Sequence, residues 1–327
     1  MLKSSIVKFF ISLSLISLPL MPSSFARGNS FLLPEGPGAA THAFGEAVTS
    51  IPIDVSVVYY NPSLLPLIKG KREIMMQYTP LLLDLSVWHG FLGTRVSLKE
   101  KLSLSLSILQ LNASEICLQE DIAGQFTTSS INNSIVYFSV SFPVVGKFNI
   151  GGNLKYISSS LVDYKSTSFG IDVGASYLYT FLDMPFLYKP TLYLGTSIQN
   201  ILQPTFKFYK LEETLERVYR VGMAFSGNIP EMYSFLEIGK LQENRLTLSV
   251  DLQFAESADK NKILPCFGAE FVYQDFLALR VGMSTTYNLT LGLGLIIPLS
   301  HTRLCVDYNY ETSLLAPLHR IGVRYVF

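Results

Sequence analysis

Apolar and polar residues alternate along much of this chain. In the stretch 246–254, leucine, valine and phenylalanine occupy the even positions, whereas threonine, serine, aspartate and glutamine occupy the odd ones. Successive side chains of a β-strand point to opposite faces, so this stretch predicts a strand with one apolar and one polar face. The same alternation predicts thirteen more strands, at 73–79, 84–98, 102–108, 134–142, 147–157, 169–181, 190–199, 217–226, 264–274, 276–285, 288–297, 302–310 and 318–327. Most of these runs have the ~9–11 residues that a tilted strand needs to cross a bilayer.

The polar faces of these strands are made mostly of Gly, Ser, Thr and Asn, and only 15% of all residues are charged, whereas 49% are hydrophobic. A sandwich of two sheets in water is the alternative, but the outer faces of a sandwich are usually rich in charge. A sheet that spans lipid must close on itself, because lipid cannot satisfy an unpaired strand edge. The pattern therefore predicts an all-β fold, a closed antiparallel transmembrane β-barrel of about 14 strands.

A fifteenth run, 233–239, would make the strand count odd. Both ends of a bacterial outer-membrane barrel normally lie in the periplasm, which requires an even number of strands. We therefore predict that this run is an excursion or a strand extension. The same parity places the long loops 112–133 and 200–216 outside the cell. Phe206, Phe208 and Tyr209 form an aromatic cluster in the second loop, which is interpreted as a ligand entry, a partner patch or a loop folded back on the barrel rim.

The first 26 residues have the pattern of an export signal. Lys3 and Lys8 precede an apolar run over 9–20, and Ser24 and Ala26 are small residues at the positions that signal peptidase reads. This pattern predicts a signal peptide cut after Ala26. A membrane-anchoring helix is the alternative, but the apolar run is shorter than the ~18 residues that such a helix requires. The expected location is the bacterial cell outer membrane, with its lipid around the barrel.

Charge and reactive residues exclude several function classes. The 25 Lys and Arg balance 25 Asp and Glu, so no basic excess supports nucleic-acid binding. The 3 cysteines and 4 histidines lack metal-ligand spacing. We expect the cysteines to pack in the core, with a disulfide as the minority alternative. No catalytic motif stands out, and we expect neither an enzyme nor a bound cofactor or metal.

The last strand ends in alternating apolar residues, with Tyr325 and Phe327 on one face and Phe327 at the end of the chain. A terminal aromatic residue after such an alternation resembles the signal that outer-membrane assembly machinery recognises. We predict that Tyr325 and Phe327 belong to this signal.

Residues 38–67 resemble the N-terminal region of the PorV/PorQ-like outer-membrane barrels, relatives of the FadL long-chain fatty acid transporters. The markers of the resemblance are Gly45, Ala47, Asp54, Tyr60, Asn61 and Pro62. Further similar stretches begin at Phe169, Leu194, Phe267, Leu289 and Asp307. The resemblance implies a hatch or plug over residues 27–70, folded into the lumen of a barrel over residues 71–327. The Gly and Pro residues of the first segment agree with this, since irregular backbone is tolerated at membrane depth only inside protein or beside a cavity.

Charged residues of the predicted strands fall on the polar, inward face. They are Asp172, Asp251, Glu270, Arg280, Arg303, Asp307, Arg320 and Arg324. One interpretation is a structural network that holds wall and hatch together, and the other is that some arginines meet an anionic ligand head group. Because a buried acid without a partner is costly, we predict that Glu46 or Asp54 lies within salt-bridge distance of Arg280, Arg303, Arg320 or Arg324. Asn61 and Pro62 complete the predicted ligand or hatch–wall contacts.

Three functions are compatible with the sequence. The first is passive uptake of hydrophobic small molecules such as fatty acids, which predicts an apolar pocket beside the hatch. The second is an accessory role in type IX-like protein secretion, which predicts exposed apolar loops and a secretion-system protein as partner. The third is a structural surface protein whose plug never opens.

Overall fold

The computed structural model describes most of the chain. The described residues are 36–82, 87–98, 102–120, 126–161, 164–184, 187–208, 211–229, 244–256, 262–284, 288–312 and 317–327. The predicted signal peptide and the run 233–239 lie outside these residues, and the domain boundaries predicted at residues 26 and 70 stay predictions. Among the described residues, no helix has the length and apolar character needed to cross a membrane.

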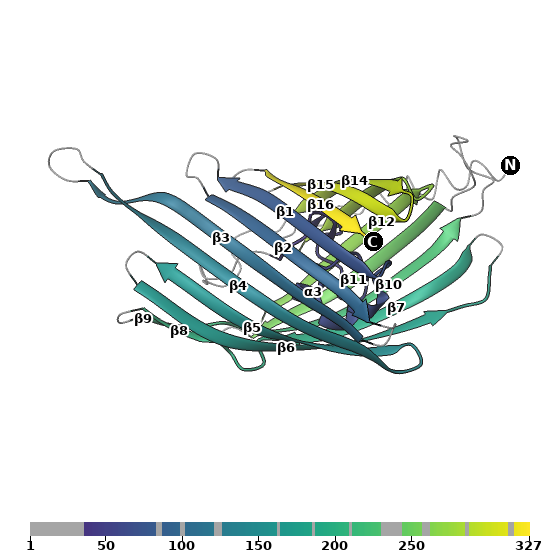
Figure 1. Ribbon diagram of the computed structural model, residues 1–327, viewed down its shortest axis with the longest axis horizontal. Helices are drawn as coiled ribbons and strands as arrows, with labels where there is room; N and C mark the ends of the chain where they lie inside the picture. Colours follow the sequence, from purple (N-terminus) through teal and green to yellow (C-terminus); the bar gives the residue numbers. More distant parts are fainter. Residues whose placement is uncertain are drawn as a thin grey trace.

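Fourteen antiparallel strands form a closed barrel (Figure 1). Its strands are β1 (Arg72–Leu82), β2 (Val87–Leu98), β3 (Leu102–Glu120), β4 (Phe126–Val145), β5 (Phe148–Leu161), β6 (Tyr164–Thr180), β7 (Tyr188–Gln199), β10 (Arg217–Ile229), β11 (Asn244–Glu256), β12 (Lys262–Tyr273), β13 (Leu277–Met283), β14 (Leu289–Leu299), β15 (Thr302–Glu311) and β16 (Leu318–Val326). A separate two-stranded hairpin consists of β8 (Thr205–Phe208) and β9 (Leu211–Thr214). The prediction of a closed antiparallel barrel of fourteen strands is confirmed.

The first and last strands close the barrel. Ile74 of β1 lies opposite Tyr325 of β16, and Arg72 and Phe327 exchange two backbone hydrogen bonds of 2.8 and 3.0 Å. We call the barrel end where β1 begins and β16 ends the terminal end. The opposite end, which carries the β8–β9 hairpin, is the loop end.

The alternation in sequence becomes an alternation of faces in the barrel wall. Along β11, Leu248 and Val250 are 50% and 41% exposed, whereas Ser249 and Asp251 are only 4% and 1% exposed. On this strand the large apolar side chains therefore cover the outside of the wall, and the polar residues face the lumen.

The loop predictions need two corrections. Most of the long loop predicted at 112–133 is strand, because β3 and β4 remain paired out to Glu120 and Phe126, with two register shifts on the way. These strands extend past their neighbours at the loop end (Figure 1). The predicted loop 200–216 contains the β8–β9 hairpin, and Lys207 N–H donates to the Ser166 hydroxyl of β6 at 3.1 Å. The hairpin thus folds back on the barrel rim, one of the three interpretations of its aromatic cluster.

Residues 36–68, which we call the N-terminal segment, pack against the inner face of the wall and are almost entirely buried. The segment contains three short helices, α2 (Ala39–Ala43), α3 (Val57–Tyr60) and η2 (Pro62–Leu67). Asn61 caps η2 by accepting a hydrogen bond from Ser63 N–H at 3.1 Å, and Pro62 occupies its first turn, where its missing N–H costs nothing. The helix α2 contacts β13 to β16, whereas η2 contacts β2 to β6. The segment therefore spans the lumen from one side of the barrel to the other.

The ring of Phe327 lies 5.5 Å from the ring of Tyr325 and 5.9 Å from the guanidinium carbon of Arg72. If the terminal aromatic residue belongs to the assembly signal, Phe327→Asp should reduce the amount of assembled barrel, whereas Phe327→Tyr should keep it. The amount of heat-modifiable protein in outer-membrane fractions measures this. Equal amounts of wild type and Phe327→Asp would argue against the signal.

Candidate functional site

Glycines of the wall bring the N-terminal segment into close contact with the strands. A Cβ atom at Gly151 of β5 would lie 2.6 Å from the carbonyl carbon of Pro62, and one at Gly268 of β12 would lie 2.5 Å from the carbonyl oxygen of Phe44. The same holds at Gly93, Gly174, Gly195, Gly222, Gly282 and Gly292, each of which faces an atom of the segment. At these glycine positions the wall therefore has no space for a side chain.

Polar wall side chains bind the backbone of the segment. Carboxylates accept from its N–H groups: Asp251 from Thr49 at 2.7 Å, and Glu73 from Val55 at 2.7 Å. Irregular backbone leaves some of its polar groups without a backbone partner, and here an acid in the wall replaces the water or the strand partner that these groups would otherwise bind.

Donors of the wall bind the carbonyl groups of the segment in the same way. Arg324 donates to Ile53 O at 2.6 Å, Asn153 to Val58 O at 2.7 Å and Ser197 to Tyr60 O at 2.6 Å. Arg95 donates to Leu65 O at 3.3 Å. Contacts from β2, β5, β7 and β16 thus hold the segment from several sides of the barrel.

Charged side chains of the wall also pair with one another. Arg280 binds Glu270 at 2.8 Å and Asp307 at 2.6 Å, and all three side chains are buried. Arg320 binds Glu311 at 2.6 Å, and His42 of the segment approaches the same carboxylate at 3.5 Å.

Lys155 and Asp172 form a third buried pair, at 2.6 Å. Asp172 also accepts from Asn153 at 3.0 Å and from the Asn200 N–H at 2.8 Å. These contacts favour the structural interpretation for Arg280, Arg320 and Asp172, because each already has a protein partner.

Of the predicted residues in the segment, Asn61 and Pro62 contact the wall directly. Asn61 donates to Thr49 O at 2.7 Å and to Ala175 O of β6 at 3.2 Å, and Pro62 packs against Gly151. Asn61 therefore ties two parts of the segment to one strand.

The two predicted acids are both 1% exposed. Asp54 accepts two hydrogen bonds from Ser56, one from its N–H at 2.8 Å and one from its hydroxyl. Glu46 lies in a turn with a positive φ of 63°. The ion pair predicted between one of these acids and Arg280, Arg303, Arg320 or Arg324 stays a prediction.

Arg303 and Arg324 line a cavity of 170 Å³ at the terminal end. Ile51, Pro52 and Ile53 of the N-terminal segment form one side of this cavity. Arg303 is exposed there, whereas the other three predicted arginines have the contacts given above.

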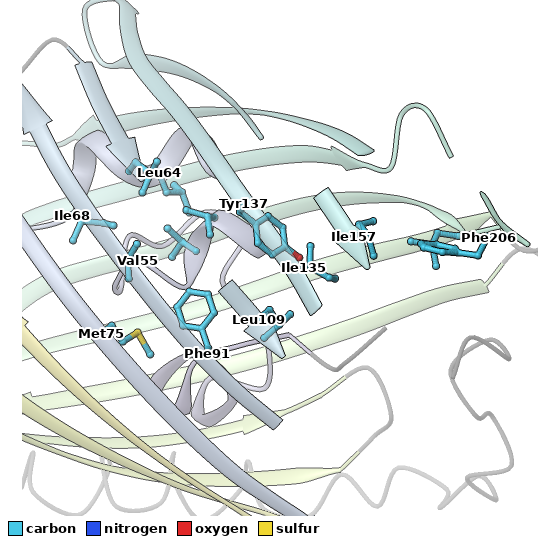
Figure 2. Packing of buried hydrophobic residues seen from close by; sticks show 14 of the residues in the cluster. Val55, Leu64, Ile68, Met75, Phe91, Leu109, Ile135, Tyr137, Ile157 and Phe206 are labelled. Carbon is cyan, nitrogen blue, oxygen red and sulfur yellow. The ribbon is translucent and has the colours of Figure 1, made fainter. Parts of the chain in front are cut away.

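An apolar cluster fills the other side of the lumen (Figure 2). Phe91, Leu109, Ile135, Tyr137 and Ile157 point inward from β2 to β5 and are at most 3% exposed. Val55, Val57, Val58, Leu64, Leu65 and Ile68 of the segment join this cluster at one end, and Phe206, Phe208 and Leu215 join it at the other. A continuous row of apolar side chains therefore connects the loop-end hairpin to the N-terminal segment.

The alternation in the sequence did not single out this row or the residues Glu73, Asn153 and Ser197. Glu73 opens a predicted strand on the inward face, so parity alone could have found it. The inward apolar residues have no such signal. An apolar residue on the polar face of a strand only breaks the alternation, and the break does not identify the residue as part of a lumen cluster.

Comparison with known proteins finds similar folds. The Ralstonia pickettii toluene transporter TbuX aligns with 89% of this chain and over 97% of its own length, at 14% identity and a TM-score of 0.50. It covers 96% of the P. putida toluene transporter TodX with the same share of its residues, at 9% identity and a TM-score of 0.52. A Pseudomonas aeruginosa FadL homologue is 12% identical over 90% of this chain and 98% of its own, at a TM-score of 0.47. No protein-family model and no curated protein matches the chain.

Proposed function

We propose that this protein is an outer-membrane β-barrel for passive uptake of hydrophobic small molecules, with the N-terminal segment as its hatch. The observation that carries the proposal is the apolar row in the lumen, from the β8–β9 hairpin to the N-terminal segment. Molecules that partition poorly into water would exchange contacts along such a row. The shared fold with two toluene transporters supports this proposal, and we expect no enzymatic activity.

The outer face of the barrel supports a membrane location. Large apolar side chains are exposed on every strand of the closed wall, for example Met76 at 62% and Phe169 at 64%. Soluble proteins rarely expose apolar surface so continuously, and a closed barrel leaves no strand edge unpaired in lipid. With the predicted export signal, the expected location is the bacterial outer membrane.

The alternative functions receive less support from the described residues. An accessory role in secretion predicted exposed apolar loops, but Phe206 and Phe208 are 0% and 4% exposed and pack into the lumen cluster. The PorV/PorQ assignment and fatty acids as the ligand remain finer hypotheses within the proposal.

Uptake of a hydrophobic fluorescent probe tests the proposed function. Intact cells that make the barrel should take up N-phenylnaphthylamine faster than cells with an empty vector, with no change for a sugar of similar size. Ile135→Asn, which places a polar group in the middle of the apolar row, should slow this uptake without altering the heat-modifiable mobility of the barrel. Equal uptake with and without the protein would refute the proposal.

The β8–β9 hairpin should control access to the row. Phe206→Ser together with Phe208→Ser removes two buried rings, each worth about 1.5–3 kcal/mol, and should therefore release the hairpin and raise probe uptake. Lys207→Ser is the matched control, since its side chain lies between the two rings in sequence but is 75% exposed. If both proteins take up the probe at the same rate, the hairpin does not cover the path.

A further inference from the structure

His42 of the helix α2 is 1% exposed, and both nitrogens of its ring face an oxygen. Nε2 lies 2.6 Å from Gly36 O of the same segment, and Nδ1 lies 3.5 Å from a carboxylate oxygen of Glu311 on β15. A neutral imidazole has one N–H donor and one lone pair, whereas an imidazolium has two donors. Either neutral form would therefore turn a lone pair toward an oxygen, and the charged form fits both neighbours.

Charged residues line the inner faces of β13 to β16, the strands that contact α2. They are Arg280, Arg303, Asp307, Glu311, Arg320 and Arg324. Arg280 and Asp307 bind each other at 2.6 Å, and the two arginines nearest the terminal end line the cavity there. Glu311 is the acid of this set that lies within ion-pair distance of His42.

Glu311 belongs to a small buried network. Arg320 binds one of its carboxylate oxygens at 2.6 Å, and Asn288 donates to the other at 3.0 Å. His89 of β2, itself 1% exposed, interacts electrostatically with His42 and Arg320. An imidazolium at His42 would be attracted by the acid and repelled by the neighbouring guanidinium. The two effects oppose each other, which suits a group that must both hold and release a proton.

We propose that His42 is a pH-sensitive switch that fastens the N-terminal segment to the wall when its ring is protonated and loosens it when the ring is neutral. Histidine is the side chain whose charge ordinarily changes between about pH 5 and pH 8. The inference rests on the proposed role of the segment as a hatch and adds a control to it. Because the fastened segment holds the proton, acid favours closure, and probe uptake should rise with pH.

The wall acids that bind the backbone of the segment would give the opposite sign. Asp251 accepts from Thr49 N–H and Glu73 accepts from Val55 N–H. Protonation would remove the negative charge that strengthens these hydrogen bonds. A switch made of these acids would loosen the segment as the pH falls, and uptake would then be fastest in acid. The direction of the pH dependence therefore separates the two devices.

Uptake of N-phenylnaphthylamine between about pH 5 and pH 8 tests the proposal, with the uptake of empty-vector cells subtracted at each pH. The probe is uncharged over this range. Wild-type uptake should increase at least about fivefold with rising pH, and His42→Gln should remove most of this increase because an amide does not change its charge. His301→Gln is the matched control. His301 is exposed in the turn between β14 and β15, so this variant should keep the wild-type profile.

Hydrogen exchange of the α2 backbone in purified protein measures the switch without relying on uptake. Protection factors, which correct for the intrinsic effect of pH on exchange, should fall with rising pH in the wild type and stay constant in His42→Gln. His42→Lys keeps its charge and should stay protected at both ends of the range. This second variant also serves if His42→Gln does not assemble.

Three results would overturn the switch: wild-type uptake that falls with rising pH, an unchanged profile in His42→Gln, or a profile that is lost in His89→Gln but kept in His42→Gln. Absence of uptake by the wild type at every pH would instead refute the proposed function. The protection factors would still decide whether His42 controls the segment.

Discussion

Replacing Gly151 with valine should displace the N-terminal segment and make the barrel leaky. The new side chain would begin 2.6 Å from the backbone of Pro62 and Ser63, where neither strand nor segment has a flexible side chain that could move away. Overpacking a tight site typically costs about 1–3 kcal/mol, which is a large part of the contact between one turn and the wall. We expect faster uptake of small hydrophobic and polar probes and faster proteolysis of the segment in purified protein.

Gly152→Val is the matched control for this change. Gly152 is the next residue of the same strand but faces outward, and a Cβ atom there would meet only Asp172 O at an ordinary 3.4 Å. Valine also favours strands, so Gly152→Val should leave permeability and proteolysis unchanged. If Gly151→Val behaves like Gly152→Val, the segment is not held by the close approach to the wall.

The second large effect is expected from Arg280→Met. This change leaves Glu270 and Asp307 as buried acids without their shared partner, and breaking such a buried network typically costs about 3–5 kcal/mol. The free energy of unfolding, measured with denaturant in detergent or lipid, should fall by this amount.

Arg217→Met provides the comparison. Arg217 also binds a carboxylate, Glu256 at 3.2 Å, but the two side chains are 29% and 50% exposed. Water screens an exposed ion pair so that it adds little to stability, and this variant should therefore unfold almost like the wild type. Similar losses for both variants would mean that the Arg280 network does not stabilise the barrel more than a surface pair does.

The two experiments address different roles of the lumen. Gly151→Val tests how the wall holds the N-terminal segment, whereas Arg280→Met tests how the wall holds itself together. A barrel that loses stability in Arg280→Met but takes up probes at the wild-type rate would show that the ion network is structural. A barrel that opens in Gly151→Val while remaining folded would support the hatch.

The sequence by itself determined the strands and their faces, because a strand in lipid needs an apolar side chain at every second position. That rule identified all fourteen barrel strands and the even number that a closed wall needs. It also placed Asp251, Glu270 and Arg280 on the inner face. It did not determine the strand ends. Ser, Thr and Ile at 127–131 fit either a loop or a strand, and only pairing with β3 made them strand.

The tertiary structure decided which inward residues meet. Glu270, Arg280 and Asp307 lie on three different strands, and only the registers of β12 with β13, β13 with β14 and β14 with β15 bring them together. Likewise, the sequence shows two adjacent glycines at 151 and 152. Only the path of residues 36–68 through the lumen places Gly151 against the N-terminal segment and leaves Gly152 without a contact to it. Alternation is a local consequence of backbone geometry, whereas these contacts join residues far apart in the chain, and their positions depend on the packing of all the strands together.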